Sequence, residues 1–160
     1  MTDTTPDAAQ FRQLMGRFAT GITVVTCRDG DGHLHGMTAN SLTSVSLAPP
    51  LLLICVDHRA SMRAPLLATG SFSVNVLEQH QEALSRRFAG KHDDRFDGIG
   101  YTSGALGHPL LDGALAQAEC VVDRVVEAGD HSIVIARVTA GSSAEGRPLL
   151  YFRGGYATLA

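Results

Sequence analysis

Short runs of β-branched and apolar residues, separated by turn residues, constrain the fold of this chain more than any other feature. The runs Ile22 to Cys27, Leu51 to Val56 and Ser71 to Leu77 have the length of strands, and Arg28-Asp29-Gly30-Asp31-Gly32 carries the hairpin signal Asp-Gly. Helical segments are few and do not alternate with the strands, which argues against a doubly wound parallel sheet. The pattern predicts a mainly β fold, a closed antiparallel barrel with a few flanking helices, and leaves a two-layer α+β sheet as the alternative.

Helical spacing is clearest near the N-terminus, where Phe11 and Phe18 belong to an apolar set at positions i, i+3, i+4 and i+7. Thr5 can cap this helix, with Pro6 in its first turn. A second helix is predicted over Glu78 to Phe88. We expect a single domain spanning residues 1–160, in which residues 1–8 are flexible.

The composition limits the partners that this chain can have. Its 160 residues are 44% hydrophobic and 18% charged with a net charge of −3, which suits a globular domain and offers no basic surface for nucleic acid. Neither a membrane-spanning run nor a signal peptide is evident, so we expect a cytoplasmic protein without a membrane partner. Cys27, Cys55 and Cys120 are widely spaced and are expected to be free, buried thiols.

Hydroxyl and amide side chains gather just before Pro49-Pro50. Together they offer neutral donors and acceptors to a ligand that carries both amide-like edges and a phosphate. Ser, Thr and Asn are equally ordinary turn residues, so a capped turn between strands is the competing interpretation. The residues are Thr38, Asn40, Ser41, Thr43, Ser44 and Ser46.

Three further clusters contain residues suited to binding. His131 follows a Gly-Asp turn at the start of a predicted strand, and Arg86 and Lys91 follow the second helix, where they can meet a phosphate or simply offset the helix dipole. The segment Tyr151 to Tyr156 combines Arg, Gly and Tyr, a mix that suits either a pyrophosphate or a terminal hairpin. His33 and His35 have metal-ligand spacing on one strand face but no evident third ligand, so we expect no metal site.

The order of these motifs is specific although each one alone is weak. Gly-Met-Thr-Ala-Asn-Ser at 36–41, Thr-Ser-Val-Ser-Leu at 43–47 and the apolar strand ending in Cys-Val-Asp at 55–57 resemble the flavin reductase family with the FMN-binding split-barrel fold. The likeness continues through Leu-Ser-Arg-Arg-Phe-Ala at 84–89 and Gly-Asp-His at 129–131 to the C-terminus. Ala48 stands where many relatives have Asp, at a position not expected to touch the cofactor.

This resemblance implies a six-stranded antiparallel Greek-key split β-barrel that works as a homodimer. It implies an enzyme that transfers a hydride from NADH or NADPH to FMN or FAD and supplies reduced flavin to a partner flavin-dependent monooxygenase. His131 is implied beside the flavin and nicotinamide as the catalytic residue. The implied cofactor-binding residues are Met37, Thr38, Ala39, Asn40, Ser41, Ser44, Ser46, Cys55, Val56, Asp57, Ser61, Arg86, Phe88, Ala89, Lys91, Arg95, Tyr151, Arg153, Gly154 and Tyr156.

A protein of another class is compatible with the same barrel, namely a non-catalytic module that binds flavin or haem. Gly129-Asp130-His131 and the Tyr151 to Tyr156 segment favour the enzyme, because a storage protein needs no nicotinamide site. The hydride chemistry itself belongs to the cofactors, so the chain is expected to contribute positioning and electrostatics.

Overall fold

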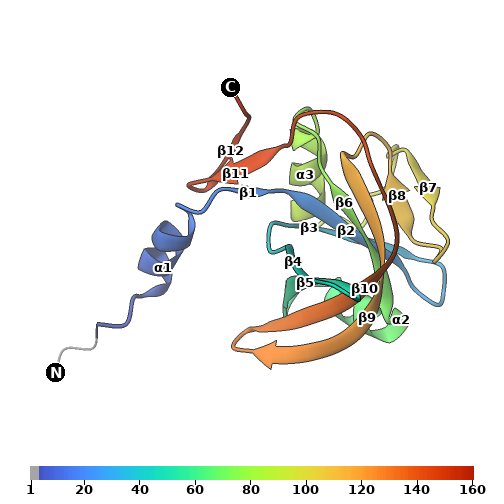
Figure 1. Ribbon diagram of the computed structural model, residues 1–160, viewed down its shortest axis with the longest axis horizontal. Coiled ribbons are helices and arrows are strands. Elements are labelled where there is room, and N and C mark those ends of the chain that lie inside the picture. The colour runs from blue at the N-terminus through green and yellow to red at the C-terminus, as the bar shows by residue number, and fades with distance from the viewer. Residues whose placement is uncertain (1–3) are drawn as a thin grey trace.

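The computed structural model describes residues 4–160 and is dominated by antiparallel strands (Figure 1). The main sheet has seven strands in the order β3-β2-β6-β9-β10-β5-β4. Their bounds are β2 Thr23–Arg28, β3 Leu34–Ala39, β4 Thr43–Leu47, β5 Pro50–Asp57, β6 Ser71–Val76, β9 Ala116–Ala128 and β10 His131–Ser143. Two small sheets join β1 Thr20–Gly21 with β11 Leu150–Phe152 and β12 Gly155–Ala157, and β7 Tyr101–Ser103 with β8 Pro109–Leu111. The helices are α1 Ala8–Met15, α2 Arg63–Thr69 and α3 Glu82–Ala89.

The predicted mainly β, antiparallel architecture is confirmed, but the count of six strands in a closed barrel is not. Within residues 4–160 no ladder pairs the edge strands β3 and β4, and the sheet has seven strands. The additional strand is β4, because part of the polar segment before Pro49 pairs with β5, with Thr43 opposite Leu53. Ser and Thr therefore serve here as exposed edge-strand residues, and a turn prediction from composition misses them.

Two apolar clusters form the core. In the larger one, alternate residues of β5 point inward, so that Ile54 and Val56 are buried between Phe72 of β6 and Met62 before α2. The smaller cluster packs Phe88 of α3 against Leu77 and neighbouring residues. The thiols of Cys27 and Cys120 belong to the larger cluster, and burial raises the pKa of each to about 12. Both are free and inert, as predicted, whereas Cys55 is only half-buried.

Two buried polar side chains bind the strands to the loop around β8. The Asn75 amide donates to the Val24 carbonyl at 3.1 Å and accepts from the Leu111 N–H at 2.8 Å. His108 accepts the Arg28 N–H at Nδ1 (2.9 Å), so its Nε2 carries the proton donated to the Ser71 hydroxyl at 2.7 Å. Burial lowers the pKa of His108, which matches this neutral state.

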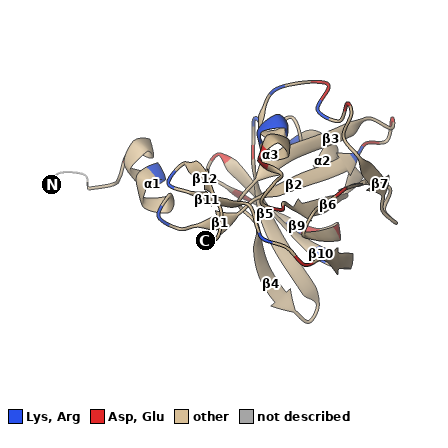
Figure 2. Cartoon of the chain, turned by 90° about the horizontal axis from the view of Figure 1, so that it is seen from above, with Lys and Arg blue, Asp and Glu red and all other residues tan. Residues whose placement is uncertain are grey.

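Helix α1 stands apart from the main sheet (Figure 1). It begins after Asp7, whose carboxylate accepts the N–H groups of Ala9 and Gln10, so the cap is Asp7 and not Thr5. None of its residues is buried and its one charged residue is Arg12, so Figure 2 shows blue and no red on this helix. Of residues 1–8, which the sequence predicted to be flexible, residues 1–3 lie outside the described part. No helix within residues 4–160 is long and apolar enough to span a membrane.

Candidate functional site

The main cavity of the described residues, about 670 Å³, lies where the chain leaves edge strand β3. Its walls come from the β3–β4 connection, the end of β5 and the turn after it, the segment following α3, and the start of β10. Its lining residues are Met37, Thr38, Ala39, Asn40, Ser41, Cys55, Asp57, Arg59, Ala60, Ser61, Met62, Phe88, Ala89, Gly90, Lys91, Asp93, Arg95 and His131. A cavity of this volume is in the range of small-molecule and cofactor sites.

The β3–β4 wall is held in place by two hydroxyl side chains. The Ser41 hydroxyl accepts the Cys55 N–H and donates to the Cys55 carbonyl, both at 3.1 Å, and thereby replaces a missing ladder contact with β5. Thr38 donates to the Ser85 carbonyl of α3 at 2.6 Å. The α3 helix can approach β3 because Gly36 has no side chain: a Cβ there would lie 2.6 Å from the Phe88 ring. These contacts leave the backbone of the wall at the cavity surface.

Positive charge lies on the side of the cavity formed by the segment after α3. Lys91 is exposed at the rim. Arg95 donates from Nη1 to the Gly36 carbonyl at 2.8 Å, and its buried Nε has no hydrogen-bond partner within residues 4–160. Across the cavity, Arg59 is paired with Asp57 at 3.1 Å, and hydrogen bonds from Arg59 lower the pKa of Asp57 to about 2. The free cationic donors therefore belong to Lys91 and Arg95.

His131 lies at the cavity rim, at the first position of β10 and opposite Asp57 in the β5 ladder. Its side chain is 41% exposed, and its Nδ1 is 2.6 Å from the Asp130 carboxylate. The same contact lowers the pKa of Asp130, so that carboxylate is ionised at neutral pH and Nδ1 keeps its proton. Nε2 is then the ring nitrogen left to a ligand.

Two smaller cavities share lining residues with the main one. The third, about 210 Å³, shares Thr38, Ala39 and Asn40 with the main cavity and is closed by Tyr151 and Tyr156. These rings pack edge to face with centroids 5.7 Å apart, and the Tyr156 hydroxyl is 2.9 Å from that of Ser85 in α3. The second, about 250 Å³, lies between α1 and the β11–β12 turn. Asn40 lines all three cavities.

Comparison with protein families decides the class of this site. Residues 15–160 match the model described as "Flavin reductase like domain", which is nearly the whole chain. The chain belongs to the flavin reductase family. The family-level resemblance seen in the motif order is thereby confirmed.

Individual flavin reductases are similar to this chain over most of its length. A probable flavin reductase of Rhizobium meliloti is 42% identical over 99% of this chain, although the chain spans only 51% of that relative. The reductase subunit of a flavin-dependent monooxygenase from Rhodococcus jostii is 39% identical over 94% of this chain and 77% of that protein. An NADH:FAD oxidoreductase of Streptomyces globisporus, solved with NAD and FAD fragments, superposes with a TM-score of 0.92 at 42% identity, covering 96% of this chain and 93% of that one.

The fold brings most of the predicted flavin reductase residues to one cavity. The residues that line it are Met37, Thr38, Ala39, Asn40, Ser41, Cys55, Asp57, Ser61, Phe88, Ala89, Lys91, Arg95 and His131. Tyr151, Arg153, Gly154 and Tyr156 lie instead on the two smaller cavities. The predicted residues are thus distributed over three neighbouring cavities, a distribution that the sequence does not reveal.

Four predicted residues lie outside all three cavities. Val56 points into the core, 1% exposed, because it alternates with Cys55 along β5. Ser44 and Ser46 lie on β4. Arg86 is paired with Glu82 at 2.7 Å and lies over the Tyr156 ring, 4.6 Å from its centroid, and it does not line the main cavity.

Sequence reasoning also missed several residues of the main cavity. Arg59, Ala60 and Met62 belong to the turn after β5, and Gly90 and Asp93 to the segment after α3. Proximity to Asp57 and Lys91 in the sequence was the available signal. Only the folded chain shows that both turns face the same space.

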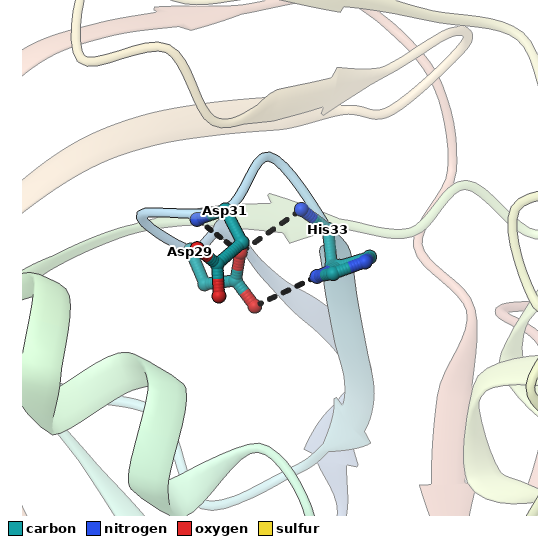
Figure 3. A group of neighbouring side chains, drawn as sticks. All are labelled: Asp29, Asp31 and His33. Carbon is teal, nitrogen blue, oxygen red and sulfur yellow. Dashed lines mark hydrogen bonds and ion pairs between the residues drawn. The ribbon is translucent and has the colours of Figure 1, made fainter.

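The hairpin between β2 and β3 holds a cluster of Asp29, Asp31 and His33 (Figure 3). The Asp29 carboxylate accepts the N–H groups of Asp31 and His33, both at 2.9 Å, and contacts His35 Nε2 at 2.8 Å. The contact with His35 is the main reason why the pKa of Asp29 falls to about 2. The Asp29 carboxylate therefore stabilises the turn, and these hydrogen bonds account for its position in the cluster.

Proposed function

We propose that this protein is an NADH:flavin oxidoreductase that transfers a hydride from NADH to a flavin in the main cavity. The observation that carries the proposal is the cavity itself: apolar walls, backbone from residues 37–41 and unpaired cationic groups converge with His131 in a flavin reductase chain. The names of the relatives, an NADH:FAD oxidoreductase among them, support this choice of donor and acceptor.

The residues present fit a flavin. Met37, Ala39 and Phe88 offer apolar surface for a planar ring system, and the nearby backbone offers polar groups to its amide-like edge. Lys91 and Arg95 offer donors to a phosphate, and the buried, unpartnered Nε of Arg95 is the kind of group that a bound anion would satisfy. A bound flavin would supply the hydride acceptor, and the chain supplies its position.

His131 is assigned the placement of the nicotinamide. With Nδ1–H donating to Asp130, Nε2 can accept a hydrogen bond from the carboxamide N–H group of NADH. Hydride transfer needs no general base, so the role of His131 is to orient the donor ring against the flavin ring. Asp130 fixes the imidazole tautomer.

One assay separates the enzyme from a non-catalytic flavin- or haem-binding module. Purified protein is mixed with FMN or FAD and NADH in air, and NADH absorbance is followed against protein-free and flavin-free controls. The enzyme consumes NADH in a flavin-dependent reaction at a rate proportional to protein. Tight flavin binding without NADH consumption would refute the proposal in favour of the module.

We also propose a split-barrel arrangement completed by a second copy of the chain. The outer face of β5 and β10 is apolar and only half-buried, with Leu53 opposite Ile135 and Cys55 opposite Ile133, and Cys55 continues it into the main cavity. Leu47, at the β4–β5 turn, is 96% exposed. A homodimer formed through this face would bury it beside the flavin.

Light scattering tests this assembly. The wild type is expected to have twice the monomer mass at micromolar concentration, and Ile135→Asp is expected to be monomeric. A wild-type monomer with full activity would contradict the dimer. The similarity to a monooxygenase reductase subunit supports the further proposal that reduced flavin leaves for a partner flavin-dependent monooxygenase.

A further inference from the structure

The segment 90–97, which follows α3, brings two cations to the main cavity without regular secondary structure of its own. Lys91 and Arg95 line the cavity from this segment. Within residues 4–160, the backbone N–H groups of the segment form hydrogen bonds only inside it or to the last turn of α3. Side chains must therefore fix its position.

The position of the segment matters because its charges are of both signs. A phosphate is attracted only where the cations are nearer to it than the carboxylates. Asp94 and Asp97 do not line the main cavity, whereas Asp93 does. The segment has no excess of positive charge, so its conformation decides whether it favours an anion. Its charged residues are Lys91, Asp93, Asp94, Arg95 and Asp97.

One side chain, that of Arg87 in the last turn of α3, binds three backbone carbonyls of this segment. Its Nε donates to the Arg95 carbonyl at 2.7 Å. Its Nη2 donates to the carbonyls of Asp94 at 2.8 Å and Asp97 at 2.7 Å, a use that suits the planar fork of a guanidinium. Arg87 forms no ion pair within residues 4–160 and lines none of the three cavities. It therefore acts on the backbone of the segment and not on a ligand.

Arg95 is held at two points. Arg87 binds its carbonyl, and its Nη1 donates to the Gly36 carbonyl at 2.8 Å. Between these two points its Nε is buried without a partner in the described part of the chain. The next residue, Phe96, packs edge to face on Phe88 with centroids 4.9 Å apart, which docks the segment on α3 independently of Arg87. Loss of the Arg87 guanidinium should therefore change the direction of Arg95 while the segment stays docked.

We infer that Arg87 is a positioning residue that makes the main cavity select flavins with a phosphate over riboflavin. It acts through Arg95, whose charge and free Nε it holds in one place. The inference rests on the proposed flavin site. Riboflavin has the ring and the ribityl chain of FMN but no phosphate, so the two ligands differ only in the group that Arg95 would meet.

The experiment measures the Kd values of FMN and riboflavin by fluorescence titration in the wild type and in Arg87→Met, which removes the donors and keeps an unbranched side chain. The wild type is expected to prefer FMN. In Arg87→Met the Kd for FMN should rise about tenfold, and that for riboflavin should change by less than about twofold. A merely structural role would weaken both flavins alike. Equal changes for the two flavins, or a wild type without preference for FMN, would overturn the inference.

Arg28→Met is the matched control. The Arg28 side chain also donates to loop carbonyls, those of Gly107 at 3.1 Å and Gly32 at 3.2 Å, but it lies outside all three cavities. The variant is expected to bind both flavins as the wild type does. A selective loss of FMN in Arg28→Met would show that any lost charge or loosened loop has this effect, and would overturn the inference.

A double variant tests whether Arg87 acts through Arg95. In a chain that already carries Arg95→Met, Arg87→Met should change the Kd for FMN by less than about twofold. A second loss of about tenfold would refute the connection.

Circular dichroism shows whether Arg87→Met folds, and Arg87→Lys takes its place if it does not. Lys keeps the charge but replaces the planar fork by a single ammonium, so a loss of at least about threefold, selective for FMN, is expected. Wild-type selectivity in Arg87→Lys would show that charge alone suffices and would overturn the inference. A wild type that binds neither flavin would instead refute the proposed flavin site, and this is measured first.

Discussion

Replacing His131 by Ala tests the proposed placement of the nicotinamide. The imidazole is 41% exposed at the cavity rim, and its hydrogen bond within residues 4–160 goes to the neighbouring Asp130. Removing it leaves no buried group unpaired and no cavity in the core. The fold and flavin binding should therefore remain near those of the wild type.

The magnitude follows from the single hydrogen bond assigned to Nε2. A bond of this kind contributes about 1–2 kcal/mol, which corresponds to a fall of about 5- to 30-fold in kcat/KM for NADH. The measurement is steady-state NADH oxidation at saturating flavin, with flavin Kd from fluorescence titration. Both an increased KM and a slower hydride transfer agree with a placement role.

His80→Ala is a matched control, because His80 is an exposed histidine that lies outside the three cavities. Its kcat/KM should equal that of the wild type. An unchanged kcat/KM in His131→Ala would refute the reasoning, and the nicotinamide would then have to be placed by other residues. A parallel loss of flavin affinity would show that His131 supports the flavin instead.

Three further predictions concern the phosphate and the core. Lys91→Gln should raise the Kd for flavin about tenfold, as measured by titration with FMN. The double variant Ser44→Ala/Ser46→Ala should change this Kd by less than about twofold, because those hydroxyls lie on β4 outside the cavities. Because the pKa of His108 is lowered in the folded chain, the unfolded chain takes up the proton first, and the free energy of unfolding should fall as the pH drops below 6.5. Urea titrations of His108→Gln should show a weaker fall with pH than those of the wild type. The same pH dependence in both proteins would contradict this. Asn75→Leu leaves the Leu111 N–H without its acceptor and should cost about 3 kcal/mol or more of unfolding free energy, so a loss below about 1 kcal/mol would refute the role given to this amide.

Local patterns in the sequence determined much of this fold. β-Branched runs and the Asp-Gly turn predicted β2 and β3, and the helical spacing before Phe88 predicted α3, because period and turn chemistry are local properties of the chain. The segment 37–41, Cys55 and His131 were likewise identified before the fold, through the order of motifs. Each lies at or near the end of a predicted strand, where loops carry function.

The tertiary structure decided which of those residues line the same cavity. Alternation along β5 sends Cys55 to the cavity and Val56 to the core, and Arg86, which is paired with Glu82, does not line the cavity. Ser44 and Ser46 became edge-strand residues because β4 pairs with β5, a contact that local composition does not encode. The meeting of α1 with Arg153 depends on a hydrogen bond between residues far apart in the chain, from the Arg153 N–H to the Gly16 carbonyl. Such long-range contacts arise from packing of the whole sheet, and they alone decided where the site ends.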